Sequence, residues 1–467
     1  MLRRTLLVPA VLLAGSIAAV AWQQGPPQLP PPKPAPQGQE PLITIMGGPG
    51  TVPHYAVPDF LPLTSDAETA AAAKTLGRVL WDDLRFEREF DMIPRDTYAT
   101  IPAARSATDV PFDRWKEIGA DGLVIGTVQK NATGLHVEMR LYQVQSGRVA
   151  FATQYDQTSD RGRAVNVRLF AHTMSDDVLQ QQVGLRGVAR TRIAFDTDRL
   201  GEPVAGPVEK RQVKEIYICD YDGENQTRVT INRNLNISPN WAPDGRSIAY
   251  TSYVPGNAAI YVSFIYQGIL KTPAGTSPQF MNFLPVFSPD GSKIAFVSNR
   301  EGNNEIYVMN TDGTNVRRLT RNPAIDVTPT WSPNGQQIAF VSDRSGAPQI
   351  YVMSAEGGDA TQKTRESYCD RPTWSPAPFN EIAFTSRTSP GVFDIKILDL
   401  ASNQVRQITF GQGTSESPAY APNGKHLAFA STRGGGWRYQ IWTIGRDGRD
   451  PRPITKAGGN FMPNWSR

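Results

Sequence analysis

The four histidines are the side chains in this sequence with the widest chemical use, because imidazole can bind a metal or carry a proton near neutral pH. His54, His136, His172 and His426 stand in unrelated segments, and none shares the close spacing of a paired metal-binding motif. No serine lies in the Gly-x-Ser-x-Gly turn that carries the nucleophile of an α/β-hydrolase. We therefore predict no catalytic residue, no metal site and no cofactor.

Three further motifs were weighed for chemistry. Met46-Gly-Gly-Pro-Gly50 is rich in glycine, but it lacks the Lys-Ser/Thr of a phosphate-binding loop, so we interpret it as a strained turn. The short repeated Asp-containing turns offer too few ligands for calcium loops. Cys219 and Cys369 lie in different repeats without metal-type spacing, so a disulfide stays open while two free thiols are favoured.

From about residue 190 onward the chain repeats itself. An aromatic residue within a turn-forming motif recurs at intervals of 43 to 46 residues, at Trp241, Phe287, Trp331, Trp374, Tyr420 and Trp465. This period is typical of one four-stranded blade of a β-propeller. We expect these aromatic side chains, Trp331, Trp374 and Trp465 among them, to pack between neighbouring blades as structural residues.

Two strand patterns each occur six times and set the number of blades at six. The Ile-Ala-aromatic type begins at Ile193, Ile248, Ile294, Ile338, Ile382 and Leu427. The Ile-Tyr-Val type begins at Ile216, Ile260, Ile306, Ile350, Ile395 and Ile441. Ile193 has no aromatic motif before it and Trp465 has no strands after it, so we predict that the C-terminal strand completes the first blade and closes the ring.

The central channel is where polar groups from all the blades can meet. We predict that the residues just before each aromatic motif lie at its mouth and bind a partner. These residues are Asn236, Asn282, Asp326, Asp370, Glu416 and Asn460. Simple solvation of a water-filled funnel is the alternative for the same six side chains, whereas a recessed polar site would accept a loop or helix end from another protein.

A different pattern occupies 42–188 and predicts a small α/β domain ahead of the all-β propeller at 189–467. Ser65 and Glu68 form a capping-box signature before a helix. Further elements are expected as strands at 90–93, 122–128, 135–144 and 149–155 and helices at 112–118 and 162–179. The fold class is therefore mixed, with a small α/β domain followed by a closed six-bladed propeller.

The N-terminal segment reads as a signal peptide at 1–21, with Arg3 and Arg4, an apolar stretch and an Ala19-Val20-Ala21 cleavage site. An uncleaved membrane anchor is the alternative. A Pro-rich linker follows at 22–41, which either spaces the domains or offers a docking peptide. The 48 basic and 44 acidic residues are interspersed, which argues against nucleic-acid binding. A monomer outside the cytoplasm is expected.

The sequence resembles the TolB family. The resemblance rests on the six repeats, on the α/β segment before them and on the stretch from His172-Thr-Met-Ser-Asp-Asp-Val178 to Thr191-Arg-Ile-Ala-Phe195. Members of the family are periplasmic propeller proteins of the Tol-Pal system, and the resemblance covers nearly everything after the linker. It implies a Pal-like lipoprotein bound at the channel mouth and a TolA-like inner-membrane protein bound by the N-terminal region. Outer-membrane integrity and cell division would be served. The Pro-rich tract at 22–41 is a departure from the family, whose members have a short N-terminal peptide in its place. Because that peptide is the expected TolA-binding region, the resemblance implies the TolA contact less directly than the Pal contact.

Two other functions compete with a non-catalytic adaptor. A secreted propeller could bind a glycan or another ligand without Tol partners, on aromatic side chains near Tyr253, Tyr266 or Trp437. A propeller enzyme would need turnover that depends on Asp326 or Asp370.

Overall fold

The computed structural model describes residues 51–104, 106–132, 134–158, 166–204, 212–265, 269–271 and 277–467. Ile43–Arg467 form one compact unit. The predicted signal peptide, the Pro-rich linker and Met46–Gly50 lie outside the described residues. In the described part of the chain, every helix is too short or too polar to cross a membrane.

The N-terminal part of this unit is built on one mixed sheet. Its strands run in the order β3 (Asp91–Met92), β1 (His54–Ala56), β4 (Gly122–Lys130), β5 (Gly134–Gln143) and β6 (Arg148–Thr158), and β2 (Leu61–Pro62) also pairs with β4. The pairs that involve β1 or β2 are parallel, whereas β4, β5 and β6 pair antiparallel. Alternation along β5 buries every second side chain, whereas the first seven residues of β4 are all buried, so the sheet has a core on each face.

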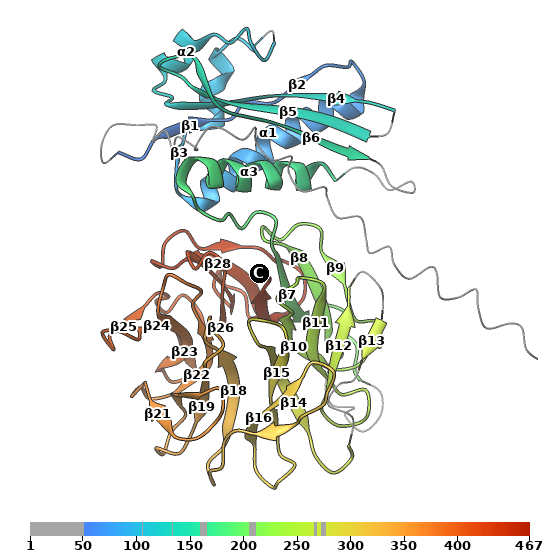
Figure 1. Ribbon diagram of the computed structural model, residues 1–467, viewed down its shortest axis with the longest axis vertical. Helices are drawn as coiled ribbons and strands as arrows, with labels where there is room; N and C mark the ends of the chain where they lie inside the picture. The colour runs from blue at the N-terminus through green and yellow to red at the C-terminus, as the bar shows by residue number, and fades with distance from the viewer. Residues whose placement is uncertain are drawn as a thin grey trace, which may run out of the picture. The chain divides into compact units, whose positions relative to one another are not determined.

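Helices cover both faces of the sheet. The helices α1 (Ala67–Glu87) and α3 (Val167–Val183) run side by side and share one core with the sheet (Figure 1). The short α2 (Phe112–Glu117) and the 3₁₀ helix η1 (Arg95–Thr100) cover the other core, around Trp115. This arrangement confirms the predicted α/β part of the fold.

The cap of α1 differs from its prediction. Asp66, one residue after the expected Ser65, is the N-cap, and its carboxylate accepts a hydrogen bond from the Thr69 backbone N–H at 2.8 Å. An aspartate at this position also places negative charge at the positive end of the helix dipole. The capping-box interpretation therefore placed the start of the helix one residue too early.

Six four-stranded antiparallel sheets follow, as the repeats predict. We number the blades by their innermost strand. Blade 1 holds β10 (Asn236–Trp241), β11 (Ser247–Ser252), β12 (Ala259–Phe264) and β13 (Ile269–Lys271); blade 2 holds β14 (Asn282–Phe287), β15 (Lys293–Ser298), β16 (Glu305–Asn310) and β17 (Arg317–Arg318); blade 3 holds β18 (Asp326–Trp331), β19 (Gln337–Ser342), β20 (Gln349–Ser354) and β21 (Ala360–Gln362).

The remaining three blades include the one that closes the ring. Blade 4 holds β22 (Cys369–Trp374), β23 (Glu381–Ser389), β24 (Val392–Asp399) and β25 (Val405–Gln407); blade 5 holds β26 (Ser415–Tyr420), β27 (His426–Ser431), β28 (Gln440–Gly445) and β29 (Arg452–Pro453); blade 6 holds β30 (Asn460–Trp465), β7 (Arg192–Thr197), β8 (Glu215–Asp220) and β9 (Thr227–Arg228).

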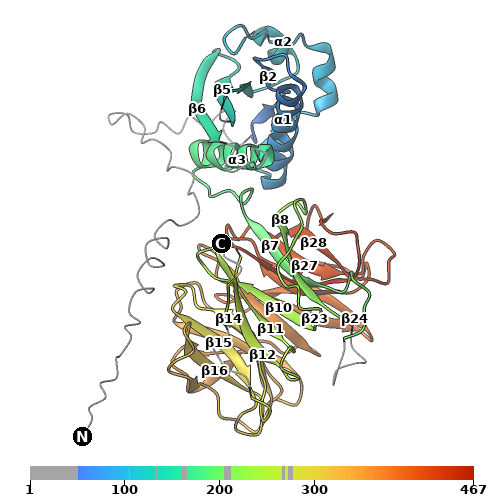
Figure 2. The same ribbon diagram turned by 90° about the vertical axis from the view of Figure 1, so that its right-hand side faces the viewer.

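The C-terminal strand closes the propeller as predicted. β30 pairs antiparallel with β7, with Trp465 opposite Ile193 and Asn460 opposite Thr197. Figures 1 and 2 both place the C-terminus beside β7. The chain ends of the propeller thus share one blade, which leaves no unpaired lateral edge between blades 5 and 6.

Turn chemistry and aromatic packing also follow the sequence prediction. Gly245 and Gly223 have φ angles of 65° and 91°, in the left-handed region that glycine adopts without strain. Trp331 is buried among residues of blades 2 and 3, including Val297 and Phe340. The repeated aromatic therefore packs between neighbouring blades.

Two details complete the description. Blade 1 has a short fourth strand, β13, so all six blades hold four strands. Cys219 and Cys369 are free and buried, as the sequence favours, and burial raises the pKa of the Cys369 thiol to about 12. The domain limits 42–188 and 189–467 stay a prediction; α3 ends at Val183, and β7 begins at Arg192.

Candidate functional site

The innermost strands of all six blades line an axial channel with the same backbone device. Each contains a β-bulge at which one residue has a φ of about 50°: Ser238, Leu284, Thr328, Arg371, Ser417 and Met462. A proline follows each of them, at Pro239, Pro285, Pro329, Pro372, Pro418 and Pro463. The six residues with positive φ, the six prolines and the residue after each proline line a cavity of about 120 Å³. The bulge bends each strand, and the proline leaves no N–H unpaired at the channel wall.

The antiparallel order of each blade gives the propeller two distinct faces. At the face where the innermost strands begin lie the connections between blades and the loops between second and third strands; we call it the entry face. At the other face, the exit face, lie the loops between first and second and between third and fourth strands. The predicted rim residues belong to the entry face because they start the innermost strands.

Four of the six predicted rim residues are buried rather than open to a partner. Asn236, Asn282, Asp326 and Asn460 are each at most 1% exposed. They occupy the first position of their strands. Arg344 donates to both carboxylate oxygens of Asp326, at 3.0 and 2.8 Å, and Arg199 donates to Asn460 at 3.2 Å. The expectation that these four side chains are free to meet a partner is corrected, because each is buried and hydrogen-bonded within the propeller.

The other two, Asp370 and Glu416, belong to a different register. The first positions of β22 and β26 are Cys369 and Ser415, so Asp370 and Glu416 stand one residue later than the other four. Successive side chains on a strand point to opposite faces, so a shift of one residue reverses their direction. The six predicted side chains therefore do not form one ring.

Asp370 and Glu416 are half-buried and remain within reach of a partner at the entry face. Tyr368 and Thr328 donate hydroxyl hydrogen bonds to Asp370 at 3.3 and 3.4 Å, and Tyr439 donates to Glu416 at 2.6 Å. Burial and the neighbouring Asp370 carboxylate raise the pKa of Tyr368 to about 12. The tyrosine therefore stays protonated at neutral pH and holds the carboxylate in place.

Most of the exposed apolar side chains of the described propeller lie on the entry face. Within the described part of the propeller, seven large apolar residues are exposed: Ile231, Val254, Val316, Ile325, Val405, Phe410 and Trp437. All except Val316 and Val405 lie in entry-face loops. Trp437 is 80% exposed and Phe410 is 69% exposed. Exposed apolar side chains on one face of a protein are candidate anchors for a protein partner.

The exit face contacts the α/β part of the unit. The end of α1 packs there, where the rings of Phe86 and His426 stack with centroids 4.2 Å apart. Arg88, just after α1, forms an ion pair with Asp447 at 2.8 Å. Burial lowers the pKa of His426 to about 3, so this imidazole is neutral and packs as an aromatic ring. The α/β part thus covers the exit face near blade 5.

Glu87, the last residue of α1, is a buried acid at this contact. Its carboxylate accepts hydrogen bonds from the Val188 N–H at 2.7 Å and from Asn423 at 3.0 Å. Burial raises the pKa of Glu87 from 4.5 to about 8. The folded protein therefore keeps a proton that the unfolded chain releases, so this group makes stability fall as the pH rises from 4.5 to 8.

Replacing Glu87 by glutamine is expected to flatten this pH dependence. Glutamine is neutral at every pH and keeps an oxygen for the Val188 N–H, so the variant should exceed the parent in free energy of unfolding by about 1–3 kcal/mol at pH 8. The two proteins should be nearly equal at pH 5. Urea unfolding at pH 5, 6.5 and 8 measures this, with Glu224→Gln, at an exposed acid of the propeller, as the control. Parallel curves for parent and Glu87→Gln would rule out Glu87 as the source.

The channel-lining prolines are the residues of the candidate site that sequence reasoning missed. Each lies two residues before the repeated aromatic, from Pro239 before Trp241 to Pro463 before Trp465. A proline inside a strand pattern indicates a bulge, because proline cannot donate to the sheet. That recurring proline was the available signal for the channel wall.

The comparisons with known proteins agree with this architecture. A family model described as the TolB beta propeller domain matches residues 179–467, and one described as the TolB amino-terminal domain matches residues 41–150. The chain is 34% identical over 278 residues to the Tol-Pal system protein TolB of Desulfosudis oleivorans, covering 57% of each chain. It is 36% identical over 279 residues to that of Anaeromyxobacter dehalogenans strain 2CP-1, covering 58% of this chain and 60% of the relative.

A solved structure extends the similarity over most of the chain. The crystal structure of TolB from Acinetobacter baumannii superposes with a TM-score of 0.73 at 26% identity, covering 89% of this chain and 97% of that one. The sequence alignments span less than two thirds of the length of the two relatives named above. The propeller family model nevertheless covers more than half of this chain. The chain therefore belongs to the TolB family of Tol-Pal system proteins.

Proposed function

We propose that this chain is a periplasmic protein-binding adaptor that docks a Pal-like lipoprotein on the entry face of its propeller. The observation that carries the proposal is that most of the exposed apolar side chains of the described propeller lie in loops of that face, at Ile231, Val254, Ile325, Phe410 and Trp437. They surround a channel mouth at which Asp370 and Glu416 offer carboxylates held by tyrosines. Apolar anchors around a polar recess suit a loop or helix end of a partner protein.

The proposal extends to the second partner and to the process. A TolA-like inner-membrane protein binds the N-terminal region, and the two contacts together serve outer-membrane integrity and cell division. The Pro-rich linker at 22–41 would present that region as an extended arm. The chain itself catalyses no reaction in this scheme, and binding is its whole contribution.

Replacing Phe410 and Trp437 together by alanine is expected to weaken capture of the Pal-like lipoprotein at least about 30-fold, because exposed aromatic anchors contribute about 2 kcal/mol or more to such interfaces. The measurement is a titration of the purified lipoprotein of the same envelope against parent and variant. Both side chains are largely exposed, so the fold should be unaffected.

Val316→Ala/Val405→Ala is the matched control, since it removes exposed apolar surface away from the entry face. It should bind like the parent. A separate Asp370→Ala/Glu416→Ala variant tests the channel mouth. Equal binding by all four proteins would exclude the entry face as the docking site.

Trp437 also supports a second candidate function, the binding of a glycan. Its exposed ring carries the Arg438 guanidinium 4.5 Å from its centroid, an arrangement that could accept a sugar face. Tyr253 is partly buried, and Tyr266 lies outside the described residues. Trp437-dependent binding of envelope glycan fragments, with no binding of the lipoprotein, would favour this function over the adaptor.

A further inference from the structure

His172, His54 and His136 all lie beside carboxylates, but the two ring nitrogens of His172 have different surroundings. In His54 and His136 each nitrogen faces its own carboxylate, at distances between 2.7 and 3.7 Å. In His172 only Nδ1 is bonded, to Asp83 at 2.8 Å. The ring is 2% exposed, and its Nε2 has no hydrogen-bond partner among the described residues. A buried nitrogen left without a partner needs an explanation.

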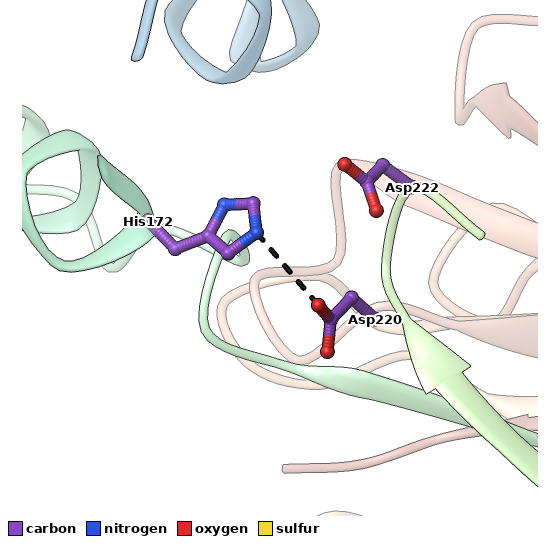
Figure 3. Close-up of side chains that lie close together, drawn as sticks. All are labelled: His172, Asp220 and Asp222. Carbon is purple, nitrogen blue, oxygen red and sulfur yellow. Dashed lines mark ion pairs between the residues drawn. The ribbon is translucent and has the colours of Figure 1, made fainter. Parts of the chain in front are cut away.

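The free nitrogen points at two carboxylates from the propeller. Nε2 lies 4.0 Å from Oδ2 of Asp220, and one ligand atom each of His172, Asp220 and Asp222 lies within 4.8 Å of the others. Figure 3 shows the imidazole directed toward Asp220, with Asp222 beside it. His172 comes from α3, whereas Asp220 ends β8 and Asp222 stands in the turn after it. Three candidate ligands, one imidazole nitrogen and two carboxylates, thus meet from two separate segments.

The partner of the other ring nitrogen matches a metal-binding histidine. Such histidines usually donate their second N–H to a carboxylate, which fixes the tautomer and makes the free nitrogen more basic. Asp83 supplies that carboxylate and is itself held by the hydroxyl of Tyr221, at 2.6 Å. Tyr221 lies between Asp220 and Asp222 in the same turn, so one short segment provides both the oxygen ligands and the support for the imidazole.

Charge at the cluster is only partly balanced. Asp83, Asp220 and Asp222 bring three carboxylates, and Arg168 pairs with Asp222 while Arg192 lies 3.9 Å from Asp220. The Asp222 side chain is 26% exposed, which gives an ion access from solvent. A tetrahedral zinc ion with ligand distances of about 2.0–2.2 Å brings its ligand atoms to about 3.4 Å from one another. The 4.0 Å gap would close with small side-chain rotations.

We propose that His172, Asp220 and Asp222 bind a divalent transition-metal cation of the zinc class, with Nε2 and two carboxylate oxygens as ligands. The nitrogen ligand favours Zn²⁺ and its neighbours over Mg²⁺ and Ca²⁺, which prefer oxygen alone. The ion links α3 to the turn between β8 and β9, and so ties the α/β part of the unit to blade 6. This site is independent of the partner on the entry face.

The test uses the full chain without a histidine tag, stripped with a chelator and titrated with Zn²⁺ by calorimetry and with Co²⁺ by visible absorption. One equivalent of ion should bind per chain, and Co²⁺ should develop the ligand-field bands of a low-coordinate nitrogen and oxygen site. Asp222→Asn, at the most exposed ligand, should weaken binding at least about 10-fold, and His172→Gln should abolish the Co²⁺ bands.

His54→Gln and His136→Gln are the matched controls, because each removes a histidine with two carboxylate neighbours elsewhere. Both should bind one equivalent as the parent does. Circular dichroism checks that each variant is folded, and Asp222→Asn keeps the test valid if His172→Gln does not fold. Absence of binding at 100-fold excess of Zn²⁺, or loss of the ion in a control variant but not in Asp222→Asn, would overturn the proposal.

Discussion

Replacing Trp465 by alanine is expected to lower the free energy of unfolding by about 3–5 kcal/mol. The indole is 5% exposed and belongs to the same apolar cluster as Ile193 and Phe195 of β7. Its Nε1 donates to the Thr191 hydroxyl at 2.7 Å. The substitution therefore removes a large buried side chain and a hydrogen bond from the one blade that joins both ends of the propeller.

Urea unfolding followed by circular dichroism measures this loss. Trp437→Ala is the control, since it removes the same kind of side chain from an exposed loop and should change stability by less than about 0.5 kcal/mol. Trp465→Phe keeps most of the buried surface and should lie between the two. A loss for Trp465→Ala no greater than that for Trp437→Ala would contradict the role of β30 in closing the ring.

Replacing Asp326 by alanine is the second large effect, with an expected loss of about 3–5 kcal/mol in the free energy of unfolding. The carboxylate is fully buried and accepts two hydrogen bonds from Arg344, at 3.0 and 2.8 Å. Its removal leaves the guanidinium, which is mostly buried, without its counter-charge. This loss of stability arises inside blade 3 and does not involve a binding partner.

Asp370→Ala is the matched comparison for this experiment. Its carboxylate is partly exposed, accepts hydrogen bonds from Tyr368, Thr328 and the Arg371 backbone, and lies 3.9 Å from the partly exposed Arg371 guanidinium, so the expected loss is about 1 kcal/mol or less. Thermal or urea unfolding of both variants gives the difference. Equal losses would mean that Asp326 does not act as a buried ion-pair partner. The comparison also shows why a binding assay should use Asp370 rather than Asp326.

The number of blades and their closure followed from the sequence alone. The blades repeat the same local patterns: an aromatic residue, followed by a Gly turn in four of the six, then an Ile-Ala-aromatic strand and a strand of the Ile-Tyr-Val type. Because five of the six sheets pair only residues close together in the chain, a repeat of 43 to 46 residues carries nearly all the information for one blade. The unmatched fragments at Ile193 and Trp465 were enough to predict the closing strand.

The six predicted rim residues do not share one register, although their spacing from the repeated aromatic residues already shows this in the sequence. Asn236 and Asp326 stand five residues before their aromatics, at Trp241 and Trp331. Five residues before Trp374 is Cys369, so the predicted Asp370 stands one residue out of register with Asn236 and Asp326. One residue reverses a side chain on a strand, so polarity without register misplaces it.

The sequence by itself determined the blade count, the ring closure and the α/β character of the N-terminal part, because these depend on patterns repeated over short distances. Only the tertiary structure decided which polar side chains meet. Asp83, His172 and Asp220 come from α1, α3 and β8, far apart in the chain, and nothing in their local spacing predicts the contact. The same is true of the pKa of Glu87, which is set by burial at a contact with distant residues. The periodicity of a segment indicates which face of its helix or strand is buried. Which residues lie against that face depends on how whole elements pack together.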